Sequence, residues 1–74
     1  MTLTPLTDIR AANKLIQEGK EIAIISMNDV VQLTKKHLEF ADEPALTRQN
    51  IRIMFQQWCG VDVKYGWEYY LVEA

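Results

Sequence analysis

Apolar residues recur at helical spacing in the first part of the chain. Four of them fall on one helical face at intervals of three and four residues: Ile9, Ala12, Leu15 and Ile16. This spacing predicts an amphipathic helix. We expect Thr7 or Asp8 to cap its beginning and Gly19 to end it, because short polar side chains favour N-caps and glycine favours C-terminal caps.

The segment that follows is short and rich in β-branched residues. Residues 21–25 have the sequence EIAII, which is typical of a strand that is buried on at least one face. A continuation of the first helix is the alternative, and Gly19 disfavours it.

The residues after this strand have the features of a helix start. Ser26 is followed three residues later by Asp29, a pattern that resembles a capping box. One helical face is then predicted from Ser26 to about Phe40, and it carries Met27, Val30, Val31, Thr34 and Leu38. Its last turns, where positive charge is favourable, hold Lys35, Lys36 and His37.

A turn at residues 41–44 ends in Pro44, which a helix does not pass through. A third helix is predicted to begin after Thr47 as the N-cap, with Leu46 packing on Ile51 as a hydrophobic staple. Gly60 is expected to stop it. The predicted buried face consists of Ile51, Met54, Phe55 and Trp58.

The remaining residues alternate between apolar and polar positions in two runs. The first run places Val61, Val63 and Tyr65 on one face, and the second places Trp67, Tyr69 and Leu71 on one face. The two runs meet at Tyr65-Gly66. Period-two alternation with aromatic content and a central glycine predicts a C-terminal β-hairpin.

The order helix, short strand, helix, turn, helix, hairpin resembles the winged helix-turn-helix family over nearly the whole chain. The closing residues 66–72, GWEYYLV, look like the glycine-aromatic-valine ending of that family's wing strands. The resemblance implies an α+β, winged-helix-like fold with three helices, a short strand at Ile22–Ile25 and a C-terminal β-hairpin. It also implies that Leu46–Cys59 is the recognition helix, which enters the DNA major groove, and that Lys64–Trp67 is the wing.

Length and composition limit the class of protein. Seventy-four residues, 49% hydrophobic and 24% charged, suit a single small globular domain over 1–74. Cys59 is the only cysteine, so no disulfide forms within the chain; together with the lack of a signal-peptide pattern this predicts a cytoplasmic protein. The longest apolar run is too short to span a membrane. A domain this small gains stability from pairing, so a homodimer remains an open alternative.

Charge is distributed unevenly. The net charge is −2, yet no acidic residue lies between Pro44 and Val61. The solvent face predicted for the third helix consists of Gln49, Arg52, Ile53 and Gln56, with Arg48 and Gln57 at its margins. Because arginine pairs with guanine and glutamine with adenine, this face suits base recognition. A solvated face built from good helix formers is the alternative interpretation.

Two functions follow as hypotheses. The first is a small protein that binds double-stranded DNA, as a transcriptional regulator or an architectural factor, through Arg48, Gln49, Arg52 and Gln56 on bases and Lys35, Lys36 and Lys64 on phosphates. The second is a protein-binding adaptor or inhibitor of the kind that phages and mobile elements encode. The net negative charge and the acidic residues Asp42 and Glu43 in the turn at 41–44 motivate it. Its contacts would be Ile53, Trp67 and Tyr70.

Catalysis is not expected. His37 is the only histidine, and no cysteine or second histidine stands at metal-ligand spacing from it. No glycine-rich phosphate loop is present, and no carboxylate pair has a setting that would tune an acid and a base. We therefore predict no metal, no cofactor and no enzymatic activity.

Overall fold

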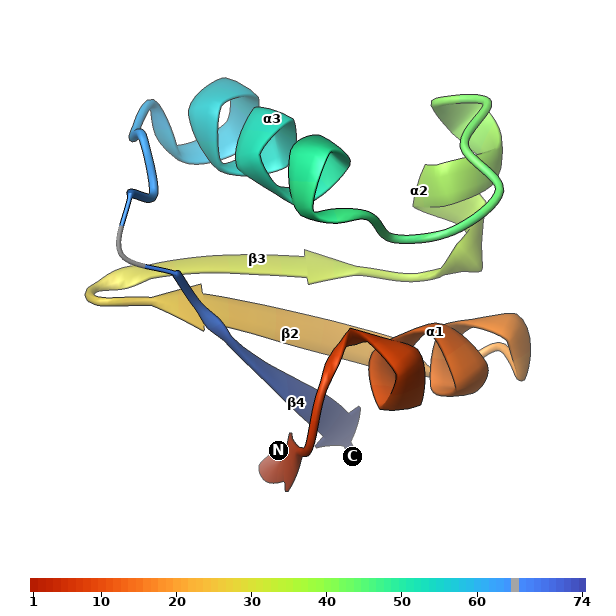
Figure 1. The fold of residues 1–74 in the computed structure, drawn as a ribbon. Coiled ribbons are helices and arrows are strands. Elements are labelled where there is room, and N and C mark those ends of the chain that lie inside the picture. The colour runs from red at the N-terminus through yellow and green to blue at the C-terminus, as the bar shows by residue number, and fades with distance from the viewer. Residues whose placement is uncertain (65) are drawn as a thin grey trace.

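Four antiparallel strands form one sheet in the order β1-β4-β2-β3, with three helices (Figure 1). The computed structural model describes residues 1–64 and 66–74. The elements in chain order are β1 (Thr2–Leu6), α1 (Ile9–Gln17), β2 (Glu21–Ser26), β3 (Asp29–Leu33), α2 (Lys35–Phe40), α3 (Arg48–Cys59) and β4 (Glu68–Glu73). The predicted α+β class and the three helices are confirmed.

The last strand of the chain lies inside the sheet. β4 pairs with β1 on one side and with β2 on the other, so that Tyr69 stands opposite both Leu6 and Ile24. β2 also pairs with β3 through a hairpin. The predicted strand Ile22–Ile25 lies within β2 and is confirmed.

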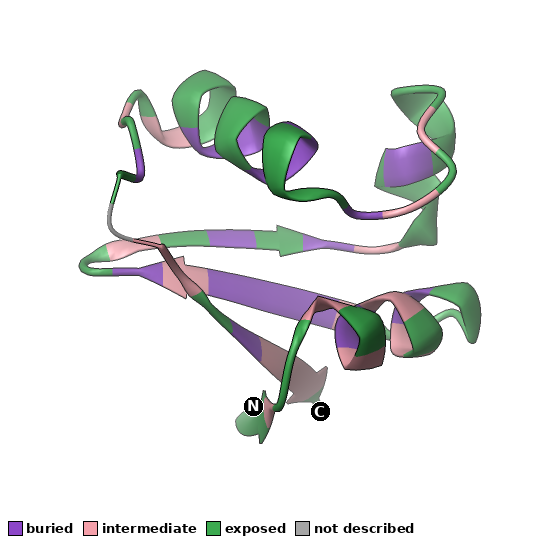
Figure 2. Ribbon diagram, in the orientation of Figure 1, coloured by how far each residue is buried: buried purple, intermediate pink, exposed green. Residues whose placement is uncertain are grey.

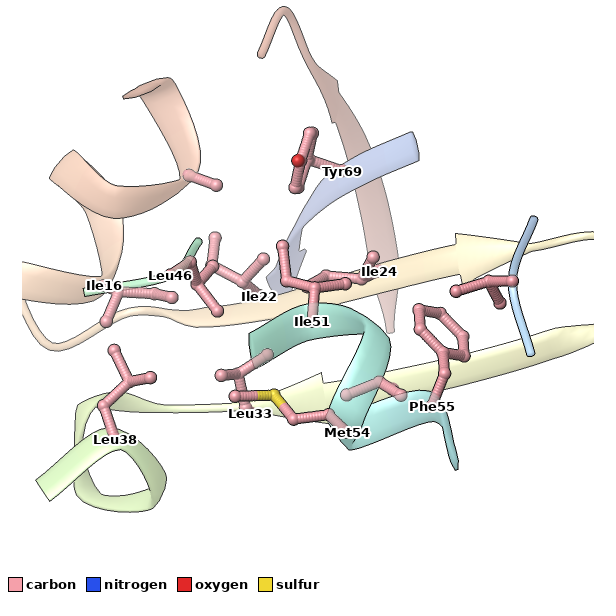
Figure 3. Packing of buried hydrophobic residues seen from close by; sticks show 13 residues of the cluster. Ile16, Ile22, Ile24, Leu33, Leu38, Leu46, Ile51, Met54, Phe55 and Tyr69 are labelled. Atoms are coloured by element: carbon pink, nitrogen blue, oxygen red, sulfur yellow. The ribbon is translucent and has the colours of Figure 1, made fainter. Parts of the chain in front are cut away.

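The core lies between the helices and one face of the sheet. α3 packs along β3, whereas α1 packs on β2 and β4. Figure 3 shows the side chains that meet between them, and Figure 2 shows the buried stretch of β2. The core residues are Ala12, Ile16, Ile22, Ile24, Val31, Leu33, Leu38, Leu46, Ile51, Met54, Phe55, Val63 and Tyr69.

The first helix follows the prediction closely. The Asp8 side chain caps it by accepting a hydrogen bond from the Ala11 backbone N–H at 3.0 Å. Gly19 follows its end with φ at +87°, and its N–H donates to Ile16 O at 2.9 Å. Because a left-handed residue is needed here, glycine at this position ends the helix without steric cost.

The second predicted helix is wrong over its first half. Residues Ser26 to Asp29 form the turn of the β2–β3 hairpin, in which Met27 adopts a left-handed backbone with φ at +53°. β3 then buries Val31 and Leu33 at a spacing of two. The Ser26–Asp29 pair that resembles a capping box therefore closes a hairpin. The helical part is α2 alone, which begins after Thr34, whose N–H donates to His37 Nδ1 at 3.0 Å.

The predicted C-terminal hairpin is also wrong. The first of its two runs forms no strand among its described residues 61–64, and Val63 of this run is buried in the core. Tyr65, at the centre of the predicted hairpin, lies outside the described residues. The second run forms β4, which pairs with β1 and β2 instead. The described residues of the predicted wing, Lys64, Gly66 and Trp67, are therefore not part of a hairpin and lie between α3 and β4 along the chain.

The hydrophobic pattern predicted neither β3, which was assigned to the second helix, nor β1. Four of its five residues are exposed, and only Leu6 is half-buried. It contains Pro5, which an edge strand tolerates because one side of its backbone has no strand partner. Within residues 1–64 and 66–74, no helix has the length and apolar content needed to cross a bilayer.

Candidate functional site on helix α3

The beginning of α3 is held by a buried asparagine. Asn50 is only 6% exposed. Its Oδ1 accepts from the Thr47 N–H at 2.8 Å, its Nδ2 donates to Ala45 O at 2.8 Å, and its own N–H donates to Thr47 Oγ1 at 3.1 Å. The predicted N-cap at Thr47 is confirmed. These bonds satisfy backbone groups that a helix start leaves unpaired, and they fix the direction in which α3 leaves the loop.

A second asparagine attaches this loop to α1. Asn13 Nδ2 donates to Leu46 O at 3.0 Å, and Asn13 Oδ1 accepts from Leu46 N at 2.7 Å. Gln17, one turn further along α1, donates to Pro44 O at 3.2 Å. The segment that leads into α3 is therefore positioned by polar side chains as well as by burial of Leu46.

The two faces of α3 separate largely as predicted. Ile51, Met54 and Phe55 are buried. Trp58, which was predicted to be buried, is 47% exposed and lies with its ring centroid 5.7 Å from that of His37. It stands near the end of the helix, where it packs against α2 rather than against the sheet. Gly60 ends α3 with φ at +71°, as predicted.

Five of the seven residues predicted to contact DNA line one groove of about 700 Å³. They are Arg48, Gln49, Arg52, Gln56 and Lys64. One wall of the groove is the exposed face of α3, and the other wall is the connection from α3 to β4. Five residues outside that predicted set also line it, namely Ile53, Asp62, Val63, Gly66 and Trp67.

An ion pair joins the two walls. Arg52 Nη2 lies 3.1 Å from Asp62 Oδ1, with side chains that are 57% and 53% exposed. At such exposure, the pair contributes little to folding stability. The pair places a hydrogen-bond donor, the guanidinium, and an acceptor, the carboxylate, side by side on the surface of the groove.

Three side chains stack at the end of the groove. The Phe55 and Trp67 rings have centroids 6.3 Å apart with planes inclined by 29°, and the Arg48 guanidinium carbon lies 5.1 Å from the centre of the Trp67 ring. Trp67 Nε1 donates to the Tyr69 hydroxyl at 2.8 Å. Aromatic stacking of an arginine leaves its N–H edges free to donate. Arg48 is therefore held in place by its face while its donors remain available.

The other two predicted phosphate contacts do not reach this groove. Lys35 and Lys36 are exposed on α2. Lys36 lines a second groove of about 510 Å³, between α2 and α3. This second groove is more apolar, since it is lined by Phe40, Ile53, Met54 and Trp58. Phe40 is 97% exposed.

Of the three residues predicted to bind a protein, Ile53 and Trp67 line the same groove and Tyr70 does not. Ile53, 43% exposed, lies between the two grooves and lines both, and Trp67 shares the first with it. Tyr70 points to the opposite face of the sheet from the buried Tyr69, because neighbouring residues of a strand alternate. Its hydroxyl donates to Glu68 Oε2 at 2.6 Å. This hydrogen bond raises the pKa of Tyr70 above 10.0, and burial and the Glu68 charge raise it further.

The histidine and cysteine side chains are each bound within the fold. Among residues 1–64 and 66–74, no three histidine, cysteine or acidic side chains gather as a metal site would require. Cys59 is half-buried, and its Sγ lies 3.7 Å from Val30 O. His37 accepts a hydrogen bond at the beginning of α2.

Comparison of the chain with protein families, with curated proteins and with solved structures found no match.

The sequence predicted the α3 residues of the site but missed Asp62. Asp62 was predicted to lie on the polar side of a hairpin. The acid-free stretch that contains α3 ends just before it. The signal that was available is its position, two residues after Gly60, because a left-handed glycine at a helix end changes the direction of the chain and lets the residues beyond it contact the helix.

Proposed function

We propose that the protein binds double-stranded DNA and lays the exposed face of α3 in the major groove. The observation that carries this proposal is the gathering of Arg48, Gln49, Arg52, Gln56 and Lys64 around one groove. All five are exposed, and their side chains are the types that donate to guanine, adenine and phosphate.

The dimensions of α3 support this use. Gln49 and Gln56 are seven residues apart on the same face, a distance of about 10.5 Å at 1.5 Å per residue. Three base steps of one DNA strand span about 10 Å. The face from Gln49 through Arg52 to Gln56 therefore spans about three base steps, or about four consecutive base pairs.

The charge of the groove supports a local contact with DNA. Three cations line it against one carboxylate, Asp62, although the whole chain has a net charge of −2. With so few phosphate contacts, a single copy binds weakly and the affinity falls with salt. Binding by two copies to adjacent half-sites would compensate.

The winged-helix resemblance enters the proposal only through α3. In that family the third helix enters the major groove, and α3 is the third helix here. β3 stands where that family has a longer second helix, and the single strand β4 stands where it has a wing hairpin. DNA contact is therefore assigned to α3 and Lys64, and no contact is assigned to a wing hairpin.

Selection of binding sites from a random duplex library, followed by fluorescence anisotropy, tests the proposal. The variant Arg48→Glu with Arg52→Glu should weaken binding to the selected duplex by at least about tenfold. The matched control, Arg10→Glu with Lys14→Glu, makes the same charge change on exposed residues of α1 outside the groove. Equal losses in the two variants, or no selected sequence, would refute the proposal.

A second candidate is protein binding through the groove between α2 and α3. The observation that favours it is the exposure of Phe40, Ile53 and Trp58, at 97%, 43% and 47%, around that groove. Affinity capture from nuclease-treated lysate should then recover one partner with the wild type. Phe40→Ser should lose that partner, whereas Met27→Ser, which changes an 82% exposed residue at the β2–β3 turn, should retain it.

A further inference from the structure

We infer that Arg52 and Asp62 act together as a unit that recognises one G·C base pair. The inference rests on the proposed DNA-binding function and specifies which base pair the centre of α3 contacts. Arg52 lies between Gln49 and Gln56 on the exposed face of the helix, and Asp62 reaches it from the opposite wall of the groove.

The ion pair leaves both groups able to bind a base. The observed contact joins one guanidinium nitrogen, Nη2, to one carboxylate oxygen, Oδ1, at 3.1 Å. A guanidinium has five N–H donors and a carboxylate has two acceptor oxygens. Since both side chains are more than half exposed, the remaining donors and the second oxygen are open to a ligand in the groove.

This arrangement of donors and acceptor matches the major-groove edge of a G·C pair. Guanine presents two adjacent acceptors, N7 and O6, which fit the fork of an arginine, and cytosine presents the N4 amino donor, which a carboxylate accepts. An A·T pair does not offer two adjacent acceptors on its purine, because the adenine amino group stands beside N7. Arg52 on guanine with Asp62 on its cytosine is therefore the matched pairing.

Asp62 also explains how a wrong base pair is rejected. It is the only carboxylate among the described residues that line the groove, and a carboxylate next to DNA is repelled by phosphates. A hydrogen bond from cytosine N4 offsets this repulsion, whereas a base without that donor leaves the carboxylate desolvated and unpaired. Its presence lowers affinity in general and raises selectivity for G·C at this position.

The test compares the selected duplex with one in which the G·C pair at the centre of the site is replaced by A·T. Wild-type protein should discriminate between them by about tenfold or more. Asp62→Ala should lower that ratio at least about threefold, chiefly by tightening binding to the A·T duplex, while the Arg52 contact keeps part of the preference for G·C. Glu39→Ala is the matched control, since it removes one exposed acidic charge on α2 away from the groove and should leave the ratio unchanged.

The outcomes separate the two proposals. If wild-type protein enriches sites that lack a G·C pair at their centre, or if Asp62→Ala keeps the wild-type ratio, the base-pair assignment is overturned while DNA binding stands. If wild-type protein binds no duplex in the selection, DNA binding itself is refuted, and this assignment with it. Circular dichroism melting of each variant verifies that the fold is retained.

Discussion

Replacing Asn13 with alanine tests whether polar contacts from α1 position the beginning of α3. The substitution removes two hydrogen bonds, at 3.0 and 2.7 Å, that pair both backbone groups of Leu46. Each such bond contributes about 0.5–1.5 kcal/mol, and a partly buried group left unpaired costs more. We expect the free energy of unfolding to fall by about 2–4 kcal/mol, a large part of the roughly 4–11 kcal/mol typical of a domain this size.

Urea denaturation followed by tryptophan fluorescence measures this loss. With a denaturant slope of about 1 kcal/mol per molar, the midpoint should shift by about 2 M or more. Asn13→Asp keeps the acceptor but loses the donor, so its loss should be intermediate. The control Gln17→Ala removes one exposed bond of 3.2 Å to the same loop and should change stability by less than about 0.5 kcal/mol. A loss for Asn13→Ala no larger than the control's would refute the reasoning.

Three other substitutions test the packing, the helix end and the sheet surface. Phe55→Ala empties a fully buried position and should cost about 3–5 kcal/mol in urea denaturation; a loss under 1 kcal/mol would contradict its place in the core. Gly60→Ala meets no atom within 4 Å but forces alanine to a φ of +71°, so thermal melting should show a loss of about 1 kcal/mol. Glu68→Gln should lower the pKa of Tyr70 toward 10.0, as measured by absorbance titration, and an unchanged pKa would rule out the Glu68 contact. Because the folded-state pKa is raised, this contact's stabilisation is complete below pH 10 and is lost as the pH rises through that pKa.

The helices with complete end signals were predictable from sequence. α3 has a capping threonine before it, a glycine after it and apolar residues at helical spacing between them, so its bounds follow from local chemistry. α1 has the same combination in Asp8 and Gly19. In both helices each end signal acts on residues within about one turn of it, so the bounds follow from local sequence.

The hairpin between β2 and β3 was not predictable in the same way. Its turn places Met27 in a left-handed conformation, which glycine or asparagine normally signals. Val30 and Val31 suit a strand as well as a helix face, so the local pattern was ambiguous. Pairing of β3 with β2, which buries Val31 and Leu33 beneath α3, decides between the two.

Most of the predicted site residues that the structure brings together lie on one helix. The exposed face of α3 follows from the helical period, which placed Arg52 and Gln56 together. The contribution of Asp62 and Trp67 depends on the path of the chain after Gly60, and that path is set by burial of Val63 and by the pairing of β4 within the sheet. Such long-range contacts leave no periodic signal.

The position of β4 in the sheet determines when β1 can pair as the chain folds during synthesis. Thr4 and Glu73, whose side chains share a hydrogen bond, are 69 residues apart. Among the strands of residues 1–64 and 66–74, β1 pairs only with β4, so during translation β1 has no strand partner until residues 68–73 have left the ribosome. Contacts of such high sequence separation slow folding. β1 precedes the other three strands of the sheet along the chain but is one of the last to pair, and folding of this domain is expected to be completed only after β4 has been released.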